Sequence, residues 1–353
     1  MPPVALFIAI VHAAVASAPQ HHVTVQVLSK YTPDQIELRS RVARHLVSIQ
    51  GDELSLNQQP AGRRLEFPFS TWRVRSGDAF DRSYRGALRI SAENGSLAIL
   101  VVAAIDDYVA DVVASETLPQ TPFEALRAQA IVSRSYVLAT RNRHKNADAC
   151  DLAHCQLFRA SHVSPRHHAE ARRATLSTKQ LVLRLASDHI ARAVFHSACG
   201  GHTASPHEVF GGNDETGAQA VADIECPPMR WTAAIARDAA AIVGRSLFGV
   251  GNGTWEFTYG DAGIVSEVVD RDTGVVVRGD VFARAFDRAL DWGVVRSGRF
   301  TISPTSSGLE LRGTGHGHLV GLCQQGAANL AKRGQSYRQI LAHYFPLAEI
   351  KPL

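Results

Sequence analysis

The sequence lacks several features that would place it in other classes of protein. It contains no internal repeat, no low-complexity segment and no basic run interleaved with aromatic residues, so a nucleic-acid binder is disfavoured. The net charge of +4 over 353 residues is small and is compatible with an anionic cell-envelope polymer as partner. Charged residues (20%) and hydrophobic residues (45%) are near globular averages, which predicts one or two folded domains.

The N-terminus lacks an apolar run long enough to span a bilayer. Residues 2–18 read PPVALFIAIVHAAVASA and end in small residues, so residues 1–20 resemble a signal peptide. We therefore expect export to the periplasm, cell wall or medium, with no stable membrane span. No Lys or Arg precedes the run and Pro19 follows the expected cleavage region, which leaves a buried strand as the alternative.

Cysteines are few, and their number, five, is odd. Cys150 and Cys155 have the spacing of metal ligands, which leaves Cys199, Cys226 and Cys323. In an oxidising compartment a Cys199–Cys226 disulfide is an option, but a sequence does not fix connectivity. Cys323 lies near histidines and permits a cysteine nucleophile, although no Asp or Asn that would orient the base is evident.

Residues 21–105 have the pattern of an antiparallel β region. Short runs such as VTVQVL, IELRS and LAILVV alternate apolar and polar residues, and turn residues such as Gly51-Asp52 separate them. From residue 106 helical patterns begin, and they continue, mixed with strands, to the C-terminus. We therefore predict an α+β fold with a β-rich N-terminal region followed by a mixed helical and β region.

Local signals predict individual elements of this second region. Asp106 or Asp107 is expected to cap a helix over 108–116, and Thr121-Pro122-Phe123-Glu124 is expected to form a capping box for a helix over 124–141. The further predictions are helices over 168–180, 230–247 and 280–291, a hairpin around Ser187-Asp188, strands near 254–278 and 299–312, a helix over 323–333 stopped by Gly334, and a last helix capped by Ser336 with Gln339.

One carboxylate falls on an apolar helical stripe. Val109, Val112, Val113 and Glu116 recur at the spacing of a single helix face. A carboxyl group there loses solvation, so its pKa rises and it can stay protonated near neutral pH, as a general acid requires. The alternative is a glutamate at a helix end that reaches solvent. No second acid stands at a spacing that identifies a partner.

Four metal-ligand side chains follow within twelve residues: His144, Cys150, His154 and Cys155. Two thiolates and two imidazoles form a ligand set that zinc prefers in closed tetrahedral sites. Four protein ligands leave no position for a water molecule, so the spacing indicates a structural zinc. The alternative is a Cys150–Cys155 disulfide with bystander histidines.

The remaining polar candidates are weaker. Arg127 and Arg134, seven residues apart, project from the same side of their helix and can hold a carboxylate or sugar hydroxyls, although such charges commonly form a solvated face. His196 and Ser197 precede paired glycines that permit close approach of a ligand to the backbone. His318 stands in a Gly-rich turn that enters a helix.

Four blocks, taken in order, resemble the stage II sporulation protein D family, which includes the LytB amidase enhancers. They are YVADVVASE with EALRAQAIVSRSYVL, then ACDLAHCQLF, then VFHSACGGHT with EVFGG, then GTGHGHLVGLCQQGA with YRQILAHYFP. The blocks extend from about residue 106 to the C-terminus, which makes 106–353 the expected catalytic domain.

The resemblance implies a peptidoglycan lytic transglycosylase that cleaves MurNAc–GlcNAc bonds in glycan strands stripped of stem peptides and leaves 1,6-anhydro-MurNAc ends. Glycan strands are the expected partner, with a cell-wall amidase as a second. Glu116 would be the single catalytic acid and base, with Arg127 and Arg134 matching basic residues of the family. Zinc-containing members match at His144, Cys150, His154 and Cys155, and substrate-binding residues are expected at His196, Ser197, His318 and Gln324.

The chain departs from the family pattern in three places. Leu118 stands where Met-Pro is usual, the Gly-Trp-Gly-His-Gly segment reads GHGHL over 315–319, and Gln325 replaces a common Trp. These changes alter the expected lining of the groove. Two other functions stay open: a non-catalytic protein that binds peptidoglycan or enhances an amidase, and a zinc hydrolase, which the four-ligand count disfavours.

Overall fold

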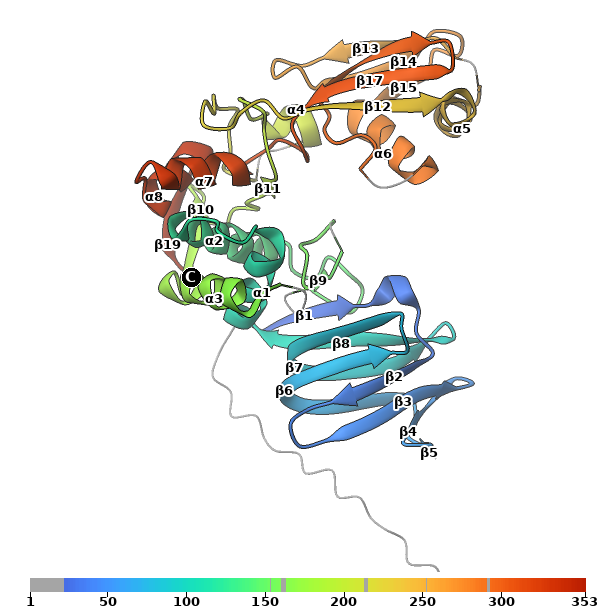
Figure 1. Ribbon diagram of the computed structural model, residues 1–353, viewed down its shortest axis with the longest axis vertical. Helices are drawn as coiled ribbons and strands as arrows, with labels where there is room; N and C mark the ends of the chain where they lie inside the picture. The colour runs from blue at the N-terminus through green and yellow to red at the C-terminus, as the bar shows by residue number, and fades with distance from the viewer. Residues whose placement is uncertain (1–21, 153, 160–162, 213–214, 252, 291–292) are drawn as a thin grey trace, which may run out of the picture.

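The computed structural model describes residues 22–353 except 153, 160–162, 213–214, 252 and 291–292. The expected signal peptide lies outside the described residues. Figure 1 shows a large β-sheet at one end, a group of helices in the middle and a smaller lobe of strands and helices at the other end. The fold is α+β, as predicted. Among the helices described here, none has the length and apolar character needed to cross a lipid bilayer.

The large sheet is built almost entirely from the N-terminal region. Its order is β5-β4-β3-β2-β6-β7-β8-β1-β9, and every pairing is antiparallel except that of β1 with β9. Buried residues alternate along β8, so one face of the sheet packs on the core and the alternation seen in the sequence is confirmed. The strands are β1 (His22–Val27), β2 (Gln35–Arg39), β3 (Arg44–Gln50), β4 (Glu53–Leu56), β5 (Gln59–Pro60), β6 (Arg64–Ser76), β7 (Phe80–Glu93), β8 (Ser96–Ala104) and β9 (Ala149–Cys150).

Three helices cover the sheet end where β8 stops. They are α1 (Ile105–Glu116), α2 (Phe123–Ala139) and α3 (Pro165–Ser177). Val109, Val112 and Val113 are completely buried, which confirms the predicted apolar stripe of α1. Because α1 continues directly from β8, Glu116 lies at the end of the helix away from that strand.

Two of the predicted helix caps are wrong. Ala104 is the N-cap of α1, and Asp106 and Asp107 lie inside its first turn without capping it. The N-cap of α2 is Pro122 and receives no side-chain hydrogen bond, while Glu124 binds groups elsewhere. In both cases the polar side chains have tertiary partners, and these outcompete the local capping geometry.

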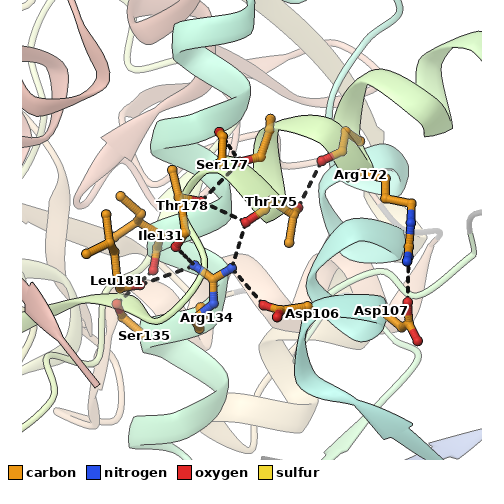
Figure 2. Close-up of polar contacts among 12 residues, drawn as sticks. Asp106, Asp107, Ile131, Arg134, Ser135, Arg172, Thr175, Ser177, Thr178 and Leu181 are labelled. Carbon is orange, nitrogen blue, oxygen red and sulfur yellow. Dashed lines mark hydrogen bonds and ion pairs between the residues drawn. The ribbon is translucent and has the colours of Figure 1, made fainter.

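The guanidinium of Arg134 joins the three helices (Figure 2). It donates from Nη2 to Asp106 Oδ1 of α1 at 3.2 Å, and it also donates to backbone carbonyl oxygens at the end of α3. Arg134 itself is completely buried. The carbonyl oxygens belong to Thr175 (3.2 Å), Thr178 (3.0 Å) and Leu181 (3.2 Å). The Thr175 and Thr178 carbonyls close α3 and the Leu181 carbonyl lies three residues beyond, so the shared cation holds α1 against the end of α3.

C-terminal elements complete the middle of the molecule. The hairpin predicted around Ser187-Asp188 is present as a short antiparallel turn, in which Leu185 N donates to His189 O at 2.9 Å and Ala191 N donates to Leu183 O at 2.8 Å. Only its first arm is a regular strand, β10, which also pairs with the C-terminal strand β19. The box of Ser336 with Gln339 is formed as predicted. The elements are β10 (Leu181–Leu185), β11 (Phe195–His196), α4 (Pro206–Phe210), β18 (Leu322–Cys323), α7 (Gln324–Lys332), α8 (Tyr337–Tyr344) and β19 (Ala348–Pro352), with β11 and β18 parallel.

The third part is a lobe with its own aromatic core around Phe282 and Phe286. The predicted helix over 230–247 is wrong in its first half, because Arg230–Ala236 forms β12 and pairs with β17. The strands predicted near 254–278 and 299–312 are present. The elements are β12, α5 (Arg237–Phe248), β13 (Trp255–Tyr259), β14 (Val265–Asp270), β15 (Val276–Arg278), α6 (Gly279–Ala289), β16 (Phe300–Thr305) and β17 (Gly308–Thr314).

Replacing Arg134 should destabilise the whole helical group. We expect Arg134→Met to lower the free energy of unfolding by about 3–5 kcal/mol, because the substitution leaves Asp106 and the α3 carbonyls without their buried donor. The matched control is Arg44→Met, since the pair of Arg44 with Glu37 is exposed and should contribute about 1 kcal/mol or less. Urea unfolding measures both, and equal losses in the two variants would contradict the assignment.

Candidate active site

Glu116 ends α1 with its carboxyl group held at one oxygen. Oε1 accepts a hydrogen bond from the backbone N–H of Leu157 at 2.7 Å. Within the described part of the chain, no donor lies within hydrogen-bond distance of Oε2. One oxygen is therefore fixed and the other is available to a ligand.

The environment of Glu116 favours its protonated form. Burial raises the pKa of the carboxyl group from 4.5 to about 7, while the Leu157 N–H and the positive charge of Arg159 partly oppose this rise. A carboxyl group with this pKa is substantially protonated at neutral pH and still loses its proton readily. It can therefore serve both as an acid and as a base.

Gln324 lies beside the acid although it is far away in the sequence. Its Nε2 donates to the backbone carbonyl of Glu116 at 3.0 Å and lies 3.3 Å from Gln129 Oε1. Gln129 is buried and donates in turn to Ser133 Oγ at 3.1 Å. The start of α7 is thereby tied to the end of α1. The predicted substrate residue Gln324 thus contacts the backbone that carries the acid.

A basic hollow next to the acid was not predicted from the sequence. It measures about 320 Å³ and is lined by Arg82, Ser115, Leu157, Arg159 and Val163. Ser115 precedes Glu116 in the chain and accepts a hydrogen bond from Arg159 N at 2.9 Å. The only signal for Arg159 was its place just after the block ACDLAHCQLF, and Arg82 of β7 gave no signal at all.

The two arginines singled out in the sequence have different surroundings. Arg127 Nη1 bonds Glu124 Oε1 at 3.0 Å, and its guanidinium lies 4.0 Å from the centre of the Tyr337 ring. Glu124 Oε2 accepts from Tyr337 N at 2.7 Å, so this group ties α2 to α8. Arg134 is enclosed in the helix core. No described contact joins either arginine to Glu116, and the buried Arg134 holds helices rather than substrate.

The predicted histidines lie together. The rings of His196 and His318 are 5.6 Å apart between centres, and desolvation lowers their pKa values to about 3 and about 4. His196 is buried with Nδ1 3.0 Å from Val320 O, and its Nε2 is buried without a partner. Both rings are therefore neutral at physiological pH. No described contact joins them to Glu116.

Ser197 connects this pair to the acid only indirectly. Its side chain is exposed, and its carbonyl accepts a hydrogen bond from Gln325 N at 3.0 Å. Gln325 follows Gln324, which contacts Glu116. The segment with His196 and Ser197 and the acid Glu116 therefore both contact the first turn of α7.

The four expected metal ligands converge. One ligand atom from each of His144, Cys150, His154 and Cys155 lies within 4.8 Å of all the others, and both cysteines are free thiols. His144 Nε2 is 3.0 Å from Cys155 Sγ, and Cys150 Sγ is 3.3 Å from His154 Nε2. The Cys150 thiol and the His144 ring lower the pKa of Cys155 to about 5. This donor set fits a tetrahedral zinc ion.

The ligand loop is anchored to the sheet and reaches the acid. Cys150 stands in β9, which pairs with β1. Asp148 accepts a hydrogen bond from Thr24 N of β1 at 2.9 Å, and Asp151 accepts one from Leu28 N, just after β1, at 3.0 Å. Leu157, which holds Glu116, follows Cys155 by two residues. The position of the acid thus depends on the order of this loop.

The raised pKa of Glu116 predicts a pH-dependent cost in stability. Because the folded pKa of about 7 exceeds the ordinary 4.5, wild-type protein should lose stability relative to Glu116→Gln as pH rises from 4.5 to 7. The difference should reach roughly 3 kcal/mol at most, since one pKa unit corresponds to about 1.4 kcal/mol. Chemical unfolding across pH measures it, with the exposed Glu53→Gln as control. Parallel profiles for wild type and Glu116→Gln would contradict the assignment.

Comparison with known proteins agrees with this geometry. Residues 93–184, which contain Glu116 and the four clustered ligands, match the family model described as stage II sporulation protein. An uncharacterized protein of Brachyspira hyodysenteriae is 26% identical over 273 residues, which cover 74% of this chain and 70% of the relative. Residues 93–184 therefore form a stage II sporulation protein domain, and this match supports a role related to the cell wall.

Proposed function

We propose that the protein is an exported lytic transglycosylase that cleaves the MurNAc–GlcNAc bonds of peptidoglycan glycan strands. The observation that carries the proposal is the carboxyl group of Glu116, which is desolvated to a pKa of about 7 and is held by a single backbone hydrogen bond. A residue that only binds glycan has no need of such a pKa. The family match over residues 93–184 supports the cell-wall substrate class.

One carboxyl group can perform both halves of the reaction. Protonated Glu116 gives its proton to the glycosidic oxygen, the bond from that oxygen to the muramic C1 breaks, and the GlcNAc end leaves as an alcohol. The carboxylate then takes the proton of the muramic 6-hydroxyl while its oxygen bonds to C1. The product carries a 1,6-anhydro end, and Glu116 is again protonated.

The surroundings of Glu116 support this cycle. Hydrolases that use two carboxylates need a second acid to activate water or to act as nucleophile, whereas an internal hydroxyl removes that need. Leu157 and Gln324 fix the side chain and backbone of the acid, which favours correct placement against a bound sugar. Arg82 and Arg159 line the adjacent hollow, where they can bind polar or anionic groups of the strand.

Glu116→Gln should abolish cleavage without abolishing folding. We expect the rate of anhydro-ended product formation from denuded glycan strands to fall at least about 100-fold, because the amide cannot donate or accept the transferred proton. Mass spectrometry of the products after a timed digestion measures the rate.

A matched control separates this role from a general effect of removing a buried acid. Asp111 lies on the same helix, bonded to His168, and burial also raises the pKa of its carboxyl group. Asp111→Asn should keep most of the activity. Products from Glu116→Gln at the wild-type rate would refute the proposal. Strand binding without products from the wild type would instead support a non-catalytic, amidase-enhancing protein.

We further propose that a structural zinc ion is held by His144, Cys150, His154 and Cys155. The support is the convergence of two thiols and two imidazoles around one point. With all four positions taken by protein, the ion would order the loop and supply no bound water for chemistry. Its effect on the reaction would pass through Leu157 to Glu116.

Loss of this ion should loosen the loop before it affects the rest of the fold. We expect Cys155→Ser to lose about one zinc per chain, to expose the segment 144–159 to proteolysis and to lower the rate of cleavage. Elemental analysis and limited proteolysis measure the first two effects. His207→Ala, at an exposed histidine outside the cluster, should retain the wild-type zinc content. Unchanged zinc in Cys155→Ser would refute the site.

A further inference from the structure

Three cysteines and one aspartate that the proposed reaction does not use meet in the interior. One ligand atom from each of Cys199, Asp223, Cys226 and Cys323 lies within 4.8 Å of all the others. Their exposed fractions are 1% or less. Cys323 stands in β18, Cys199 follows β11, and the other two belong to the loop before β12. The cluster therefore joins three separate stretches of the chain.

Two of the three sulfurs have backbone donors that suit a thiolate. Cys323 Sγ accepts from the backbone N–H groups of Cys199 and Gly326, each at 3.3 Å, and Cys226 Sγ accepts from Gly200 N at 3.3 Å. Cys323 is also the N-cap of α7, where the helix dipole favours negative charge. Backbone donors of this kind stabilise a charged sulfur much more than a neutral one.

The surroundings of Asp223 independently indicate a side chain that binds a cation. Its Oδ2 lies 2.8 Å from the Tyr344 hydroxyl and 3.1 Å from Cys199 Sγ, whereas its Oδ1 is buried and has no partner. No described Lys or Arg forms an ion pair with Asp223. Arg299 approaches the cluster but donates to carbonyl oxygens, that of Cys199 among them. Buried carboxylates are ordinarily paired with a cation or coordinate a metal.

We infer that Cys199, Asp223, Cys226 and Cys323 form a second structural zinc site. Thiolates and a carboxylate are ligands of Zn²⁺, and four of them complete a closed tetrahedron. With bonds of about 2.3 Å the sulfurs would stand roughly 3.8 Å apart, which is compatible with ligand atoms that all lie within 4.8 Å of one another. On binding, three thiol protons pass to solvent, and the backbone N–H groups offset the remaining negative charge.

A Cys199–Cys226 disulfide explains fewer features of the cluster than a bound metal ion does. The Cys199–Cys226 pairing left open by the sequence would use two of the three sulfurs. It would leave the Cys323 thiol without a role and Asp223 Oδ1 without a partner. The five cysteines of the described structure are free thiols. A metal ion uses all four side chains.

The second site would hold the acid through a different segment from the first. Cys323 is followed by Gln324, whose side chain contacts the backbone of Glu116. Cys199 stands just after His196 and Ser197 in the parallel pair of β11 with β18. The ion would thereby fix the segment that carries the histidines against the start of α7.

The decisive measurement is the metal content of a variant that lacks the first site. The full chain with Cys150→Ser and Cys155→Ser, purified anaerobically with a non-chelating reductant, should retain about one zinc per chain. Adding Asp223→Asn should lower zinc affinity at least about tenfold in chelator competition, since loss of even an outer partner of a metal site costs 10–100-fold. Adding the exposed Asp261→Asn instead should leave the affinity unchanged.

Cobalt provides a readout of the ligands themselves. Co²⁺ bound to the variant without the first site should show thiolate-to-cobalt charge-transfer absorption, which Cys226→Ser should weaken. Circular dichroism verifies that each variant is folded. A folded variant that binds neither zinc nor cobalt would overturn the inference, as would an intact Cys199–Cys226 disulfide in the purified chain. Neither readout depends on glycan cleavage, so the result stands apart from the proposed activity.

Discussion

The buried guanidinium of Arg134 is the interaction on which the arrangement of the helices depends. A single cation at the centre of the helical group binds Asp106 at the start of α1 and the carbonyl oxygens that end α3. The guanidinium is completely buried, so its loss removes one donor from each of these acceptors in a place where water cannot replace it. Because α1 is rigid, fixing its first turn also fixes Glu116 at its far end.

From that point the acid is held by two segments that are distant in the sequence. The loop after β9 supplies the Leu157 N–H, and the start of α7 supplies Gln324. Neither segment has much regular structure to order it before it reaches the acid. Each contains or directly follows a group of converging thiols, Cys150 with Cys155 on one side and Cys323 on the other. The metal ions that we propose would hold these two segments in a fixed conformation, as a sheet or a long helix does elsewhere in the molecule.

Local patterns predicted a large part of the fold. The alternation over 22–105 became the antiparallel sheet, and the stripe of Val109, Val112 and Val113 became the buried face of α1. The box of Ser336 with Gln339 formed because, among the residues that the structure describes, no tertiary partner competes for those side chains. Asp106 and Glu124 bear equally good local signals, but Arg134 and Tyr337 N bind them, so neither cap exists. Residues 230–236 were assigned to a helix because pairing with β17 is invisible in a local window.

The sequence by itself determined which side chains are candidates, namely Glu116 as the acid and the four clustered Cys and His side chains as metal ligands, because each rests on residue type and spacing within a short stretch. Only the tertiary structure decided which candidates share a site. Arg134 is buried among the helices and does not contact the acid. Arg159 and Gln324 lie next to Glu116 instead. The tertiary structure also gathered Cys199, Asp223, Cys226 and Cys323 from three stretches. Contacts between residues so far apart in the sequence form only when the chain folds. The burial that raises the pKa of Glu116 also exists only in the folded protein.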